Sequence, residues 1–309
     1  MARISKKAGV RALSSFLFPD LPILSAADGL QDALARAGQA VLEAPPGAGK
    51  STLVPLLLLQ APWLEGRRIL MLEPRRIAAR AVATRMAAVL QEEVGQRVGY
   101  RMRLESRVSS KTRIEVVTEG ILARLLQDDP ALETYGCIIF DEFHERSLNT
   151  DLGLALCLDA RRNLRPDLRI LVMSATLDGA AVASLLGDAP RITSAGKMYD
   201  VEVRYAKRSI EHMDREVAAT IQRALQEAPG DALVFLPGAA EIHRVARTLE
   251  SVGLDRAVRV LPLMGDLTSQ AQDLALQPSA PHERKVVLST SIAETSLTID
   301  GVQIGRAHV

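Results

Sequence analysis

The sequence has few aromatic residues, and its positive and negative charges almost cancel. Aromatic residues make up 3% of the 309 residues, which argues against nucleic-acid binding that depends mainly on stacking bases on Phe or Tyr. Thirty-eight Lys and Arg residues against thirty-seven Asp and Glu residues leave a net charge of +1. The composition therefore predicts no polycationic surface, and any nucleic-acid partner has to be argued from local motifs.

Cysteines are equally scarce. Cys137 and Cys157 are the only two, and they lie in or near apolar segments with no CxxC pair and no histidine at ligand spacing. Because neither a disulfide framework nor a zinc-binding pattern is present, both are expected to be buried free thiols.

Long hydrophobic runs are also missing. No apolar stretch reaches the roughly 20 residues that a membrane-spanning helix needs. The N-terminus is basic and then apolar, but Pro19, Asp20 and Pro22 interrupt the apolar part. Residues 1–20 are therefore expected to form a flexible leader rather than a signal peptide. A cytoplasmic protein without a membrane partner is the resulting expectation.

Short β-rich runs alternate with helical patterns, which is typical of parallel sheets covered by helices. The expected fold class is α/β, with two similar units in tandem. Expected strands of the first unit are Ala40–Glu43, Arg68–Leu72, Arg113–Val117, Cys137–Phe140 and Arg169–Met173, with helices at Ile77–Leu90 and Glu119–Leu126. After a break around Pro190–Met198, the second unit is expected to have a helix near Arg215–Glu227 and strands at Ala232–Leu236, Val258–Leu263 and Lys285–Leu288.

Polar clusters begin where the five strands of the first unit end. In chain order they are APPGAGKS, EPRR, TEG, DEFH and SAT. Ligands of open parallel sheets bind at the carboxyl ends of the strands. The clusters therefore predict one functional site at that edge of the first sheet.

The segment Ala44–Ser51 (APPGAGKS) follows the first strand and opens a helical stretch. It matches the phosphate loop GxxxxGK[ST], with Ala44 in place of the first glycine. Gly47 and Gly49 allow the backbone amides to turn toward phosphate oxygens, Lys50 is expected to reach the β- and γ-phosphates, and Ser51 to bind Mg²⁺. The alternative is a plain glycine-rich turn. The expected nucleotide-binding residues here are Pro46, Gly47, Ala48, Gly49, Lys50, Ser51 and Thr52.

A pair of carboxylates, Asp141 and Glu142, follows the buried run CIIF. In a chain with a phosphate loop, Asp141 is the expected Mg²⁺ ligand, and Glu142 can orient or deprotonate the attacking water. The alternative is a solvated acidic turn. His144 alone is more typical of a structural histidine.

The other clusters are ambiguous from the residues alone. Ser174 and Thr176 in SAT have the chemistry of a helix cap. Arg75 and Arg76 in EPRR and Thr118 in TEG are candidate phosphate contacts, although an arginine pair is more commonly a solvated face.

Taken together and in order, the motifs are similar to those of a known family. GAGKS, EPRRIAAR, VVTEG, DEFHERSLNTDL, MSATL, LVFLPG and STSIAETSLTIDG resemble the superfamily 2 DEAH-box helicases. The resemblance runs from about Leu21 to Gln303. It implies two tandem RecA-like P-loop domains, at 21–193 and 194–303, the second incomplete, with ATP and Mg²⁺ as cofactors and single-stranded or partly duplex nucleic acid, RNA favoured, as the partner.

The resemblance also assigns roles to single residues. Lys50 and Ser51 hold phosphate and metal, Asp141 binds the same metal, and Glu142 is the hydrolytic base. His144 links the nucleotide site to the second domain, and Ser174 and Thr176 couple hydrolysis to strand movement. The implied nucleic-acid contacts are Arg75, Arg76, Thr118 and Thr290, and the implied contacts to the nucleotide from elsewhere are Arg85, Glu294, Thr295 and Ser296.

The chain departs from the family pattern at three places. Ser291 replaces an Asn before the IAET run, and Leu276 stands about where relatives place a Phe that packs on the base. The family's QRxGRAGR motif, which carries the arginine fingers, is not found. The final IGRAHV only imitates part of it, so residues 304–309 are expected to be a sequencing or cloning scar and Arg306 is not a finger.

The expected function is ATP-dependent RNA unwinding or translocation, with hydrolysis impaired in these 309 residues for lack of the arginine-finger motif. A P-loop kinase or an ABC-type ATPase is a second hypothesis, but neither an LSGGQ block nor an arginine-rich lid is present. A nucleic-acid remodelling ATPase that does not unwind duplexes is a third, and the motifs serve both tasks.

Overall fold

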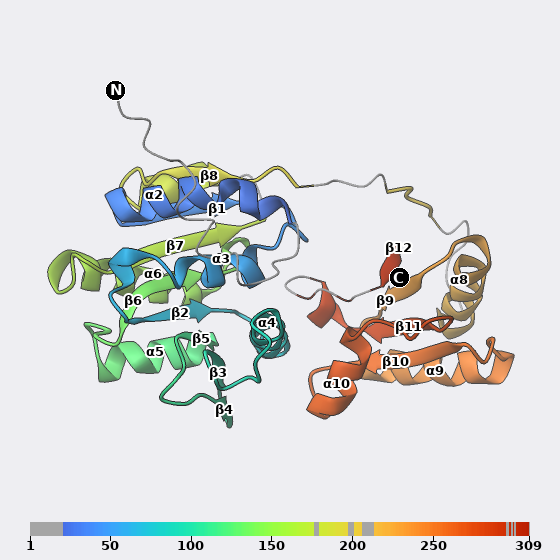
Figure 1. The fold of residues 1–309 in the computed structure, drawn as a ribbon. Coiled ribbons are helices and arrows are strands. Elements are labelled where there is room, and N and C mark those ends of the chain that lie inside the picture. Colours follow the sequence, from blue (N-terminus) through green and yellow to red (C-terminus); the bar gives the residue numbers. More distant parts are fainter. Residues whose placement is uncertain are drawn as a thin grey trace. The chain divides into compact units, whose positions relative to one another are not determined.

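The computed structural model describes residues 21–175, 179–196, 201–205, 213–294, 297, 299 and 301–308. The chain divides into two compact units, Met1–Met198 and Tyr199–Val309. Each unit has its own sheet, and each is α/β as the sequence predicts (Figure 1).

The first unit is built on an eight-stranded sheet in the order β4-β3-β5-β2-β6-β7-β1-β8. All neighbouring strands are parallel except the pair β3 and β4. The strands are β1 (Gln39–Glu43), β2 (Arg68–Leu72), β3 (Val98–Met102), β4 (Glu105–Arg107), β5 (Ile114–Val117), β6 (Tyr135–Phe140), β7 (Arg169–Ser174) and β8 (Arg191–Thr193). The five strands predicted for this unit are confirmed, with small shifts at their ends.

Helices cover both faces of this sheet. The α-helices are α2 (Ala27–Ala37), α3 (Lys50–Leu58), α4 (Arg76–Val89), α5 (Glu119–Asp128), α6 (Leu148–Asn163) and α7 (Gly179–Leu185), and the 3-10 helices are η1 (Pro22–Ala26), η2 (Pro62–Leu64) and η3 (Phe143–Glu145). One core joins α2, α3 and α4 to one face, and a second core joins α5, α6 and α7 to the other. Since successive side chains of a strand point to opposite faces, β6 contributes Ile139 to the first core and Ile138 to the second. Cys137 and Cys157 are buried free thiols, as expected.

The second unit has a four-stranded parallel sheet in the order β10-β11-β9-β12. Its elements are α8 (Met213–Glu227), β9 (Asp231–Phe235), α9 (Ala239–Val252), β10 (Val258–Leu263), α10 (Ser269–Leu276), β11 (Arg284–Ser289), η4 (Ser291–Ala293) and β12 (Val302–His308). Helices α8 and α9 pack on one face, and α10 packs on the other. The predicted helix and strands of this unit are confirmed.

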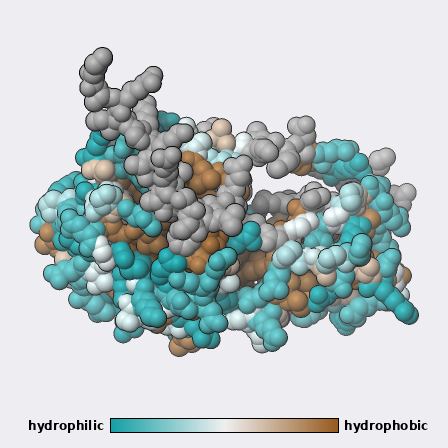
Figure 2. All heavy atoms as spheres, in the orientation of Figure 1, coloured by the Kyte–Doolittle hydropathy of each residue, from teal (hydrophilic) through white to brown (hydrophobic). Residues whose placement is uncertain are grey.

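Four strands were not predicted. β3 and β4 form a hairpin in an arginine-rich stretch, and β8 lies within the expected break at Pro190–Met198. β12 includes residues 304–308, within the segment interpreted from sequence as a scar, and pairs with β9 with two register shifts. Hydrophilic residues cover most of the visible face of the molecule (Figure 2). Among the described residues, no helix is both long and apolar enough to cross a membrane.

Candidate active site

The predicted polar clusters lie at one edge of the first sheet because the strands that precede them are neighbours. The order β5-β2-β6-β7-β1 places the five strand ends in one row. Backbone hydrogen bonds tie adjacent ends together: Ala44 donates to Ser174 at 3.1 Å, and Asp141 donates to Leu72 at 3.0 Å. The fold therefore brings APPGAGKS, EPRR, TEG, DEFH and the start of SAT to the carboxyl edge of a single sheet.

The phosphate loop connects β1 to α3. Gly49 precedes the helix in the left-handed conformation (φ +96°), and Gly47 has φ +76°. Residues other than glycine rarely adopt such positive φ angles. Lys50 is buried, and its Nζ donates to the carbonyl of Ala44 at 2.7 Å. The lysine ammonium is thus held within the loop, where its charge is available to a bound anion.

Asp141 follows β6 and is almost completely buried. Its Oδ1 accepts the backbone N–H of Glu142 at 2.9 Å. Burial raises the pKa of this carboxyl, the neighbouring Glu142 raises it further, and the Ser51 hydroxyl and Lys50 ammonium oppose the rise. The charges of the loop and of the DEFH segment therefore act on one another directly.

Glu142 is mostly buried, and burial raises the pKa of its carboxyl while Lys50 and Arg75 lower it. His144 Nδ1 lies 3.3 Å from Glu142 Oε2, and burial lowers the pKa of the imidazole. The lowered pKa of His144 favours the neutral imidazole, and the raised pKa of Glu142 makes its carboxylate a stronger base toward a proton of water.

A metal ion fits beside Asp141. The Oδ2 atom of Asp141 is buried and finds no hydrogen-bond partner within the described part of the chain. In the same described ranges, no three His, Cys, Asp or Glu side chains are grouped so that they could hold a metal by themselves. One free carboxylate oxygen beside a serine hydroxyl is a donor set suited to Mg²⁺, which is commonly bound by one or two carboxylates together with substrate phosphates.

Arg75, Arg76 and Thr118 follow strand ends at the same edge, and Arg85 lies further along α4. Arg75 precedes α4, and its Nε donates to Glu145 Oε2 at 3.1 Å. Arg76 is the exposed first residue of α4, and Arg85 is exposed on the same helix. Thr118 is half-buried and accepts the first backbone hydrogen bonds of α5 through its carbonyl.

Ser174 is the buried last residue of β7. Thr176, like Thr295 and Ser296, lies outside the described residues. In the second unit, Thr290 and Glu294 flank η4. Leu276 ends α10 and packs, half-buried, on the core of its own unit.

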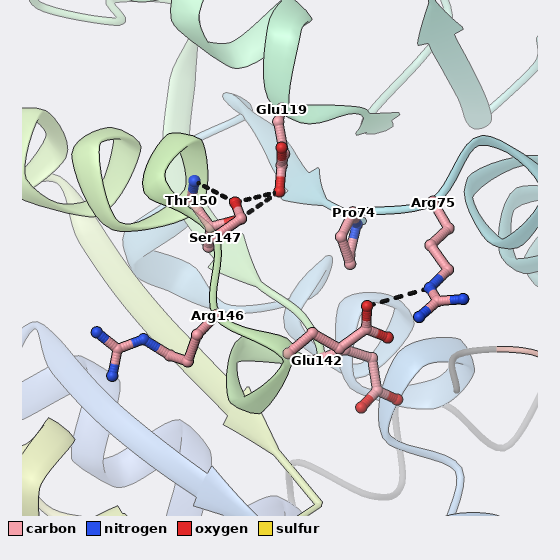
Figure 3. A pocket seen from close by; sticks show the side chains of 8 residues that line it. Pro74, Arg75, Glu119, Glu142, Arg146, Ser147 and Thr150 are labelled. Atoms are coloured by element: carbon pink, nitrogen blue, oxygen red, sulfur yellow. Dashed lines mark hydrogen bonds and ion pairs between the residues drawn. The ribbon is translucent and has the colours of Figure 1, made fainter. Parts of the chain in front are cut away.

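A pocket beside Glu142 contains residues that the motif analysis did not single out. Figure 3 shows Arg75 on one side of it, Arg146 on the other, and Glu119 beside Ser147 and Thr150. Glu145, which also lines it, directly follows the DEFH motif. Glu145 and Ser147 belong to the segment DEFHERSLNTDL, so the sequence could have indicated them. Glu119 is distant in sequence and reaches them only through the fold.

Comparisons with known proteins show which family the chain resembles. A family model described as DEAD/DEAH box helicase matches residues 28–185, and one described as helicase conserved C-terminal domain matches residues 213–305. The chain is 48% identical over 286 residues to the ATP-dependent RNA helicase HrpB of Escherichia coli (strain K12), covering 92% of this chain and 35% of that protein.

Two solved structures of E. coli HrpB are similar to this chain. One, titled as a DEAH/RHA helicase, matches with a TM-score of 0.85 and 47% identity, covering 92% of this chain and 36% of that one. The other, titled as a DExH-box NTPase, matches with a TM-score of 0.74 and 47% identity, covering 93% of this chain and 35% of that one. The chain spans about a third of the length of the relatives that it matches.

Proposed function

The chain belongs to the DEAD/DEAH box helicase family, and from this premise we propose that it is the ATP-using part of an ATP-dependent RNA helicase or translocase. Its proposed cofactors are ATP and Mg²⁺, its proposed partner is single-stranded or partly duplex RNA, and its proposed location is the cytoplasm. Membership of this family also argues against the P-loop kinase and the ABC-type ATPase, the two hypotheses that a phosphate loop alone allows.

The observation that carries the proposal is the placement of Lys50, Asp141 and Glu142 at one sheet edge. Lys50 is buried with its ammonium against the loop carbonyls, and its charge acts on both carboxylates. A nucleotide polyphosphate brings the anion that this lysine can bind, and it also brings the oxygens that complete a metal site beside Asp141.

In the proposed mechanism, the amides of Gly47 to Ser51 and the Lys50 ammonium bind the phosphates. Asp141 and Ser51 would hold Mg²⁺, which would supply positive charge against the negative charge of the phosphates. Glu142 accepts the proton of the attacking water, and His144 stays within 3.3 Å of the Glu142 carboxylate. Arg75, Arg76, Thr118 and Thr290 bind the RNA backbone.

We further propose that residues 1–309 alone bind ATP but hydrolyse it slowly. The sequence contains no QRxGRAGR motif, and an arginine finger contributes about 10³–10⁵ in rate where one is used. Robust RNA-stimulated turnover by these 309 residues would refute this part of the proposal.

The test is Mg·ATP binding and residual hydrolysis by the wild-type chain and three variants. Lys50→Ala is expected to weaken ATP binding at least tenfold because it removes the cation that faces the phosphates. Glu142→Gln is expected to retain binding within a few fold and to lower residual hydrolysis at least tenfold. Lys111→Ala, at an exposed lysine of the segment between β4 and β5, is the charge-matched control and is expected to change neither.

Two results would contradict the assignment. Intact ATP binding in Lys50→Ala would show that the phosphate loop does not bind the nucleotide as proposed. Intact hydrolysis in Glu142→Gln would show that Glu142 is not the catalytic base. A strand-displacement assay with duplex RNA separates unwinding from remodelling without unwinding.

A further inference from the structure

The turn that follows the proposed catalytic base touches both loops that are proposed to hold RNA. This turn, Glu142–Ser147, contains η3 and leads into α6. The pocket beside Glu142 is lined by residues of this turn, of the EPRR segment and of the starts of α5 and α6, namely Pro74, Arg75, Glu119, Glu142, Glu145, Arg146, Ser147 and Thr150 (Figure 3). Nucleic acid and nucleotide sites are therefore connected within the first unit through a few side chains.

The EPRR loop reaches the turn through an ion pair. Arg75 Nε lies 3.1 Å from Glu145 Oε2, and the two side chains are 27% and 17% exposed. A phosphate oxygen that binds Arg75 has to compete with this carboxylate, because both are anionic acceptors for the same guanidinium. Binding of RNA through Arg75 thus bears directly on Glu145, three residues after the base.

The TEG loop reaches the same turn from its other side. The Glu119 carboxylate accepts hydrogen bonds from the hydroxyls of Ser147 at 2.6 Å and Thr150 at 2.8 Å. Ser147 is also the N-cap of α6 and accepts the backbone N–H of Thr150 at 3.0 Å. The C-terminal end of the turn is therefore fixed to the residue that follows Thr118.

The turn between these two attachments is strained. Glu142 has φ +47° and Arg146 has φ +45°, although neither is a glycine. Residues held in this region cost on the order of 1–3 kcal/mol each and persist where their surroundings hold them. The turn therefore depends on its surroundings to hold Glu142 in place, and the Arg75–Glu145 contact is one of them.

We propose that Glu145 is a positioning residue that couples RNA binding to the nucleotide site. Without RNA, Glu145 holds Arg75 and keeps the turn in the observed conformation. When an RNA phosphate binds Arg75, the Arg75–Glu145 ion pair breaks and the turn moves Glu142 relative to the bound nucleotide. This inference rests on the proposed function and names how its two sites communicate.

The test uses the 309-residue chain, a fluorescent single-stranded RNA oligonucleotide and Mg²⁺ with a non-hydrolysable ATP analogue. RNA affinity is measured with and without the analogue, and analogue affinity with and without RNA. The two ratios must agree, because coupling between sites is reciprocal. The wild-type chain is expected to show a ratio of about fivefold or more, the usual lower range for coupled sites.

Glu145→Gln is expected to bind RNA about fivefold more tightly in the absence of nucleotide, since the Glu145 carboxylate no longer competes with RNA phosphate for Arg75. Its coupling ratio is expected to fall below about half the wild-type value. The matched control is Asp151→Asn, which removes the same charge from an ion pair with Arg146 at 2.8 Å beside the same turn. The control is expected to keep the wild-type coupling ratio.

A second variant makes the effect specific to the ion pair. In an Arg75→Gln background, Glu145→Gln is expected to lose most of its effect on RNA affinity and coupling, because the Arg75–Glu145 ion pair is already absent. The proposal is overturned if Glu145→Gln and Asp151→Asn behave alike, or if the effect of Glu145→Gln persists without Arg75. A wild-type chain that binds neither RNA nor nucleotide overturns the proposed function, and this inference with it.

Discussion

Gly179, at the start of α7, lies against the carboxylate of Glu43. A Cβ added at Gly179 would lie 1.6 Å from Glu43 Oε1 and 2.5 Å from the carboxyl carbon. Glu43 ends β1 next to the phosphate loop, is buried, and pairs with Arg191 at 3.3 Å. Because this carboxylate is enclosed and paired, we expect Gly179→Ala to destabilise the protein by about 1–3 kcal/mol, as overpacking commonly does. Denaturant unfolding measures this.

Gly120 provides the control for this substitution. It lies in the first turn of α5 with nothing within 4 Å of an added Cβ. Since alanine has up to about 1 kcal/mol more helix propensity than glycine, Gly120→Ala is expected to be neutral or stabilising. Equal changes in the free energy of unfolding for Gly179→Ala and Gly120→Ala would show that the limited space beside Glu43 does not cause the destabilisation.

At the level of single elements, the N-terminus of α6 depends on one serine. Ser147 accepts the N–H of Thr150 and donates to Glu119. We expect Ser147→Ala to lower the free energy of unfolding by about 1–2 kcal/mol, because both the helix cap and a partner of Glu119 are lost. Asn149→Ala, at an exposed residue whose amide reaches Glu119 only at 3.4 Å, is the control and is expected to have a small effect. Thermal unfolding of both variants is the measurement, and equal losses of unfolding free energy in Ser147→Ala and Asn149→Ala would contradict the prediction.

The elements that sequence predicts well are those whose own residues decide their structure. β6 is apolar along its whole length, and all its residues are buried, so a local pattern suffices. β3 carries Arg101, whose side chain pairs with the buried Glu115 of β5 at 3.0 Å. That partner is fourteen positions away in the chain, so an arginine-rich stretch resembles an exposed segment until the fold is known.

The candidate site shows the same limit. The phosphate loop and the Asp141–Glu142 pair are contiguous motifs next to buried strands, and their common sheet edge follows from strand order. The contacts that link them to neighbouring loops, such as Arg75 with Glu145 and Glu119 with Ser147, join residues 70 and 28 positions apart. No spacing rule in the sequence indicates such pairs, so they required the structure.

For the whole molecule, we predict that the first unit folds and binds nucleotide without the second. Its sheet is covered on both faces by its own helices, and both of its hydrophobic cores consist of residues between Ile23 and Ala189. A fragment of residues 21–198 is therefore expected to unfold in one cooperative transition. A ligand at about 100 times its dissociation constant adds roughly 2.7 kcal/mol of stability, so Mg·ATP is expected to raise the melting temperature by several degrees. The same fragment with Lys50→Ala should fold equally well and lose that shift. A fragment that fails to fold, or one whose melting temperature Mg·ATP raises equally with and without Lys50, would contradict the prediction.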